Sequence, residues 1–88
     1  MGSKEFSNLC ISEVLKYVVD HTDKTDNVKL SEDNIFVVWS CKTLQNNKAL
    51  LSTTLPDGMY YECTYNGDKK ELYLDVYKKW ENKRIEVK

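Results

Sequence analysis

Two short turn motifs divide the second half of the chain and most strongly constrain its fold. Pro56-Asp57-Gly58 pairs a proline, which presets φ at the first corner of a turn, with a glycine, which accepts a left-handed conformation at the exit. Asn66-Gly67-Asp68 is a second turn motif. The segments that flank these motifs alternate between apolar and polar residues, which is typical of strands. The sequence therefore predicts consecutive antiparallel strands joined by tight turns.

The predicted strands begin at Ile35, where β-branched and aromatic residues follow a polar connection. Asn46 and Asn47 tolerate positive φ and predict the first hairpin turn, with a second strand over residues 48–55. A third strand is expected over residues 59–65. We expect three sequential antiparallel strands from these segments alone.

The last segment, residues 71–87, fits two structures. Leu72 and Leu74 alternate with polar and aromatic residues as in a strand, and the residue types of this segment favour a fourth strand. Tyr73, Val76 and Trp80 also fit one face of a helix. The helical alternative would give an α-β-β-β-α order of elements.

An amphipathic helix is predicted ahead of the strands. Apolar residues recur there at the spacing of one helical face; they are Phe6, Cys10, Ile11, Val14, Leu15, Val18 and Val19. Ser3 and Ser7 are candidate N-caps, so the helix should begin between Lys4 and Asn8. It should end near His21, because the short polar residues of Thr22–Asn27 favour turns over helix.

These elements predict one α+β domain over residues 1–88, with residues 1–5 expected to be disordered or to derive from expression. The helix should pack on one face of an antiparallel meander sheet of three to four strands. With 41% hydrophobic and 31% charged residues, the composition is that of a globular domain. A chain of 88 residues buries only a modest core.

Aromatic residues exceed what one helix can cover. If Trp39, Tyr61, Tyr65 and the apolar residues of 72–76 face the helix, a second apolar set is left for the opposite face. That set is Phe36, Val38, Leu50, Tyr60, Tyr73 and Tyr77. An exposed patch of this composition would mark a surface for a partner or for self-association. The alternative is that the sheet curls or that the C-terminal segment covers the patch.

No catalytic or metal-binding pattern stands out. Cys10, Cys41 and Cys63 are widely separated, and neither they nor His21 have the short spacing of a structural zinc site. Cys41 and Cys63 fall in phase with core-facing positions, so we expect free, buried thiols. We predict no enzymatic activity and no cofactor.

Charge and hydropathy limit the partners. The net charge is −1. The C-terminal half is rich in lysine, but the acidic residues among 71–86 cancel much of its positive charge, so charge alone does not favour binding to nucleic acid. The apolar runs are too short to cross a bilayer, and the start of the chain has no signal-peptide pattern. We therefore expect a cytoplasmic protein.

The stretch from His21 to Asn82, which includes VVWSCKTLQNNKALL, PDGMYYECTYNGD and LYLDVYKKW, resembles a family of short phage and prophage proteins of unknown function from Gram-positive hosts. The resemblance implies an origin and a cellular context, but no catalytic or binding residues. Together with the missing catalytic pattern and the surplus of aromatic positions, it leads us to expect a non-enzymatic protein of the bacterial host cell. This protein would bind a host or phage protein, for example as an inhibitor of a defence factor such as a CRISPR nuclease. A homo-oligomer is an alternative arrangement. The alternative function is a double-stranded nucleic-acid-binding module, because the α-β-β-β-α order is similar to that of double-stranded-RNA-binding domains.

Overall fold

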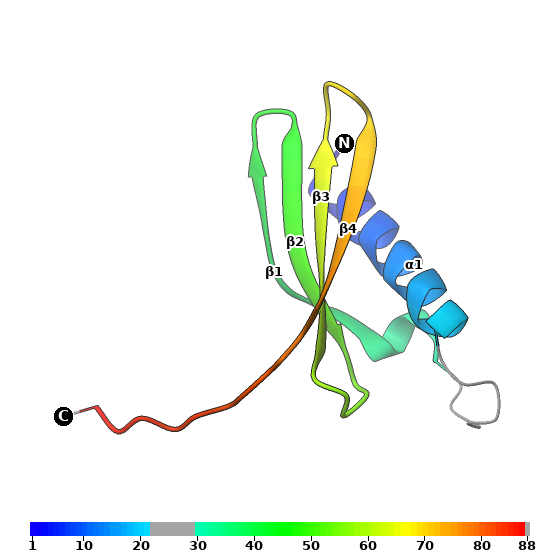
Figure 1. The fold of residues 1–88 in the computed structure, drawn as a ribbon. Coiled ribbons are helices and arrows are strands. Elements are labelled where there is room, and N and C mark those ends of the chain that lie inside the picture. Colours follow the sequence, from blue (N-terminus) through cyan, green and yellow to red (C-terminus); the bar gives the residue numbers. More distant parts are fainter. Residues whose placement is uncertain (22–29, 88) are drawn as a thin grey trace.

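The computed structural model describes residues 1–21 and 30–87, and it contains one helix packed against one face of a four-stranded sheet (Figure 1). The elements are α1 (Ser3–His21), a short 3-10 turn η1 (Glu32–Asn34), β1 (Ile35–Thr43), β2 (Asn46–Thr53), β3 (Met59–Asn66) and β4 (Glu71–Lys78). The strands lie in the order β1-β2-β3-β4, and every neighbouring pair is antiparallel. The α+β meander is therefore confirmed, with β1 and β4 at its edges.

The last segment forms strand β4, so the fourth strand is confirmed and the C-terminal helix of the alternative is wrong. Leu72, Leu74 and Val76 pack against the core, while Tyr73 and Tyr77 point to the other side. This alternation pairs eight residues of β4 with β3. In a strand, a pattern of period two places all its apolar side chains on one face, and the backbone groups bond to the neighbouring strand. In a helix the same pattern would leave part of these apolar side chains exposed.

Helix α1 covers the sheet with residues spaced one turn apart. Phe6, Cys10, Val14 and Val18 are buried, and they pack with Ile35, Ala49, Leu51, Tyr61 and Cys63 of the sheet. The helix begins at Ser3, one residue before the predicted range and within the five residues that we expected to be disordered, and it ends at His21 as predicted. The polar run Thr22–Asn27 lies outside the described residues.

A β-bulge at Val38 changes the faces of β1. Val37 pairs with Leu51 and Trp39 pairs with Leu50, so Val38 is an extra residue in the strand. An extra residue shifts the alternation by one, and the predicted sides of the residues after Val38 are therefore wrong. Trp39 and Cys41 lie on the face opposite the helix and are exposed.

The same bulge turns Ser40 and Lys42 toward the helix, whereas a strand without it would place them on the opposite face. Ser40 pairs with the buried Ala49, and both Ser40 and Lys42 line a pocket with Phe6 of α1. A small serine at this place lets the helix lie close to the strand, which the large ring of Trp39 would prevent.

The first hairpin turn is at Leu44–Gln45, not at Asn46–Asn47 as predicted. Thr43 pairs with Asn46, which leaves two residues in the loop, and Leu44 takes the positive φ of 56°. The two asparagines have other roles in β2. Asn46 Oδ1 accepts a hydrogen bond from the Gly67 N–H at 3.2 Å, and Asn47 is buried.

The other two turns are confirmed. Asp57 Oδ1 accepts from the Met59 N–H at 3.1 Å, and Gly58 takes a φ of 69° at the exit of the turn. Asn66 Oδ1 accepts from the Asp68 N–H at 3.1 Å. At Gly67 an added Cβ would lie 2.2 Å from the Gln45 carbonyl oxygen, so glycine is required where the two hairpin turns touch.

Candidate functional site

The face of the sheet opposite α1, which we call the outer face, carries a set of large apolar side chains. It comprises Phe36, Val38 and Trp39 of β1, Leu50 of β2, Tyr60 of β3, and Tyr73 and Tyr77 of β4. The set includes all six residues predicted for an exposed sheet face. Trp39 is the seventh, and its position depends on the bulge.

Most of the outer face is open to solvent. Tyr73 and Tyr77 are 50% and 51% exposed, and Phe36, Val38 and Trp39 are 42–48% exposed. Leu50 and Tyr60 lie at the centre of the sheet and are half-buried by their neighbours. Tyr60 pairs directly with Tyr77 across β3 and β4. A shallow apolar depression of about 360 Å³ is lined by Leu50, Tyr60, Tyr77, Lys78 and Lys79.

The C-terminal segment does not cover this face. Lys79 donates its backbone N–H to the Gly58 carbonyl oxygen at 2.7 Å, and its Nζ lies 5.8 Å from the centre of the Tyr60 ring. Beyond Lys79 the chain leaves the sheet (Figure 1), and Trp80 is 95% exposed. The aromatic residues of the outer face are therefore surface residues in this chain.

Acidic side chains lie among the aromatic ones. Glu62 and Asp75 are directly opposite each other on β3 and β4. Lys48 of β2 makes an ion pair with Glu62, with Nζ 3.2 Å from Oε1. Glu71 accepts a hydrogen bond from the Tyr73 hydroxyl, which raises the pKa of this tyrosine. Three carboxylates against one lysine give this part of the outer face a negative balance, whereas Lys78 and Lys79 place positive charge beside Tyr60.

The cysteines do not form a cluster that could carry chemistry. Cys10 of α1 and Cys63 of β3 are buried and share a hydrogen bond in the core, which, together with burial, raises the pKa of Cys10. The same hydrogen bond lowers the pKa of Cys63, against the opposing effect of burial. Cys41 was predicted to be buried, but the bulge exposes it on the other side of the sheet. A thiolate nucleophile needs a nearby base and access to a substrate, which the buried Cys10 does not have.

The remaining candidates for catalysis or metal binding also lie apart. His21 stacks on Tyr17, with ring centres 3.9 Å apart, and its Nδ1 donates to the Tyr17 carbonyl oxygen at 2.8 Å. Within residues 1–21 and 30–87, no three His, Cys, Asp or Glu side chains are grouped as metal ligands would be. In the same part of the chain, no helix has the length and hydropathy needed to span a membrane.

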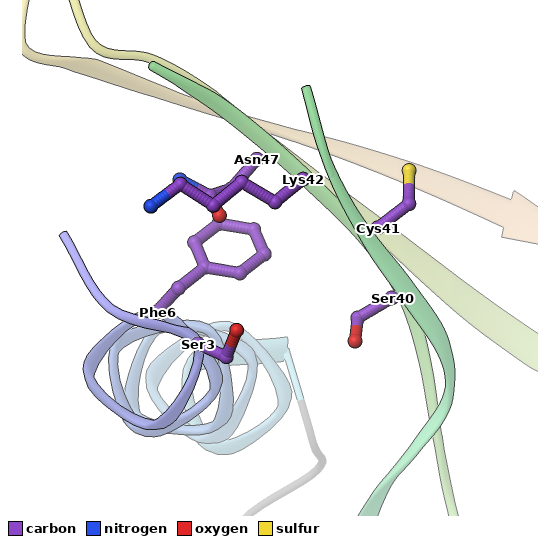
Figure 2. Close-up of a pocket in the computed structure, with 6 residues that line it drawn as sticks. All are labelled: Ser3, Phe6, Ser40, Cys41, Lys42 and Asn47. Atoms are coloured by element: carbon purple, nitrogen blue, oxygen red, sulfur yellow. The ribbon is translucent and has the colours of Figure 1, made fainter. Parts of the chain in front are cut away.

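A second feature lies on the helix side of the sheet, where the first turn of α1 meets the ends of β1 and β2 (Figure 2). A pocket of about 130 Å³ is lined there by Ser3 and Phe6 of α1 and by Ser40, Cys41, Lys42 and Asn47 of the sheet. Figure 2 shows Lys42 and Asn47 beside the Phe6 ring, whereas the Cys41 thiol points to the other side of the sheet. No pattern in the sequence singled out this pocket.

Comparison with known proteins places the chain in a family. A family model, described as a family of unknown function (DUF6275), matches residues 7–87. The chain belongs to DUF6275. The match spans all four strands of this DUF6275 member, most of α1 and every residue of the outer face. No curated protein and no solved structure matches the chain.

Proposed function

We propose that the chain is a non-enzymatic protein of phage or prophage origin that binds a host or phage protein through its outer face. The observation that supports this proposal is the open aromatic surface on the side of the sheet that α1 leaves uncovered. Aromatic residues are enriched in protein interfaces, and a contiguous apolar patch is unusual on a monomer without a partner. Inhibition of a host defence factor, such as a CRISPR nuclease, is one form that this binding would take.

The charge of the outer face specifies the chemistry of the partner. Glu62 and Asp75 face each other, and only Glu62 has an ion pair with Lys48. Like charges directly opposite on neighbouring strands are destabilising, so a cation placed between them from outside is favourable. Tyrosine rings beside them can also bind a guanidinium group by cation–π contact. The partner is therefore a protein surface that presents an arginine or lysine among apolar side chains.

The test is capture of a bacterial partner by the purified chain and by a variant that carries Tyr60→Ser and Tyr73→Ser. We expect one protein to be retained by the natural sequence, and its affinity to fall at least about thirtyfold in the variant, because truncated interface tyrosines cost about 2 kcal/mol or more. Retention should also weaken as salt is raised, since a charge contact contributes. Circular dichroism should remain unchanged.

Val19→Ser is the matched control, because Val19 is 54% exposed on α1, away from the outer face. It should leave capture unchanged. If Tyr60→Ser disturbs the fold, Tyr73→Ser alone tests the same surface, since Tyr73 is more exposed. Equal loss of capture in the control, or full capture by the tyrosine variants, would contradict the proposal. A dimer of the free chain that Tyr73→Ser dissociates would make a second copy the occupant instead.

The alternative, a double-stranded nucleic-acid-binding module, depended on a C-terminal helix. That segment is strand β4, and three carboxylates lie along β3 and β4 of the outer face, which repels phosphates there. No specific feature of the described residues favours this alternative, so we do not propose it.

A further inference from the structure

The pocket between α1 and the sheet contains a buried hydrogen-bond donor without an acceptor. Asn47 is only 3% exposed. The Nδ2 of its side-chain amide has no hydrogen-bond partner among the described residues. A buried donor that lacks an acceptor is destabilising and uncommon in native proteins. Asn47 also lines the pocket of Figure 2, so an acceptor placed there would satisfy its amide.

The other polar groups of the pocket are donors as well. The first bond of α1 runs from the Phe6 N–H to the Gly2 carbonyl oxygen at 3.0 Å, so the amides of residues 3–5 have no acceptor within the helix. This end of a helix carries a partial positive charge. Lys42 Nζ lies 3.1 Å from the Met1 carbonyl oxygen, which places its ammonium group at the same end. The Ser3 and Ser40 hydroxyls can also donate.

The pocket contains no carboxylate. Glu5, in the first turn of α1, is exposed and is not among the lining residues, although its carboxylate lies near Gly2 at the same end of the helix. The volume of about 130 Å³ also exceeds what a single water molecule needs, which is about 10–15 Å³. The pocket thus combines several donors, one ammonium group and room for a small polyatomic group.

We propose that this pocket binds a small oxyanion, a phosphate or a carboxylate group, through the Asn47 amide, the Lys42 ammonium group and the first turn of α1. An oxyanion has several acceptor oxygens, and each donor of the pocket can reach one of them when the anion lies between the helix end and the sheet. Because the pocket and the outer face lie on opposite sides of the sheet, this binding is independent of the proposed function.

The experiment is a titration of the isotopically labelled chain with sodium phosphate, sodium acetate or sodium chloride at matched ionic strength, followed by amide NMR. Phosphate or acetate should shift the Asn47 side-chain NH₂ signals and the backbone amides of residues 3–5 in a saturable way, whereas chloride should not. The oxyanion that binds more tightly identifies the source as a phosphate group or a carboxylate group.

Two variants and one control sharpen the result. Lys42→Gln should weaken binding about tenfold, since it removes one charge-assisted hydrogen bond. Asn47→Leu should abolish the saturable shifts and should unfold at a temperature no lower than the natural sequence in anion-free buffer. Lys48→Gln, which removes a lysine from the outer face, should bind the anion normally. Identical shifts with chloride, no shift at the Asn47 NH₂ signals, or equal weakening by Lys48→Gln would overturn the proposal.

Discussion

The two faces of the sheet carry aromatic side chains of similar size in different environments. On the helix-covered face, Tyr61 is 3% exposed with its ring centre 5.9 Å from that of Tyr17, and Phe6 of α1 is 2% exposed. On the outer face, Phe36 and Tyr77 remain 48% and 51% exposed. Burial of apolar area stabilises the fold by about 25 cal/mol per Å². The stability of the monomer therefore accounts for the first set of aromatics but gives little reason for the second.

The largest expected difference between the faces is in thiol reactivity. Cys41 is exposed on the outer side, whereas Cys10 and Cys63 are buried. We expect one thiol per native chain to react rapidly with iodoacetamide and the other two to react at least about a thousandfold more slowly, because they require global opening of the fold. Peptide mass spectrometry over a time course measures each rate.

This labelling also tests the bulge at Val38. A deletion of Val38 restores regular alternation with Trp39 and Cys41 still on the outer side, so Cys41 should stay reactive in the deletion variant. If β1 were regular in the natural sequence, Cys41 would lie under the helix and would be protected there. Rapid labelling of Cys63 in the folded chain would contradict the division between the two faces.

A smaller difference is expected in the stability of two phenylalanine variants. Phe6→Ala removes a buried ring from the core and should lower the free energy of unfolding by about 3–5 kcal/mol. Phe36→Ala makes the same chemical change on the outer face and should cost about 1 kcal/mol or less. Urea unfolding followed by circular dichroism measures both. Equal losses would show that the outer face is part of the packed core.

The smallest expected effect concerns Asp75→Lys. The change replaces a like-charge pair with Glu62 by an opposite-charge pair, so the free energy of unfolding should rise by about 0.2–1 kcal/mol. Binding of the basic partner should fall at the same time, since a cation now occupies the outer face. Glu81→Lys in the C-terminal segment makes the same charge change and should alter neither quantity. A loss of stability in Asp75→Lys would contradict the charge arrangement that specifies the partner.

Most of the fold follows from local rules in the sequence. The helix, the strand order and the turns at Pro56-Asp57-Gly58 and Asn66-Gly67-Asp68 were predicted because turn residues and periodicity act over a few positions. The fourth strand was predicted from residue preference. Its pairing with β3 shows that the segment is a strand and not a helix. The six residues predicted for an exposed face lie on the outer face, while their binding role stays a prediction.

The bulge and its consequences could not be predicted from periodicity. Residues 35–39 are all apolar, so no polar position marks which side faces the solvent. The extra residue Val38 therefore cannot be recognised from the sequence of this run. The turn lies at Leu44–Gln45, and the alternation of β2 then buries Asn47. The pocket at the start of α1 depends on the register of β1 and β2 as well. Such features arise from contacts between distant segments, which local preferences do not record.

The bulge also affects how copies of the chain meet. A meander leaves β1 and β4 as open edges, whose free backbone groups can pair with another chain and start aggregation. The bulge interrupts the regular ladder along β1, which makes an extended pairing with a second chain less favourable. On β4, Glu71, Asp75 and Lys78 place charges along the edge. The chain can thus present an apolar surface at high concentration while both of its edges disfavour fibril growth.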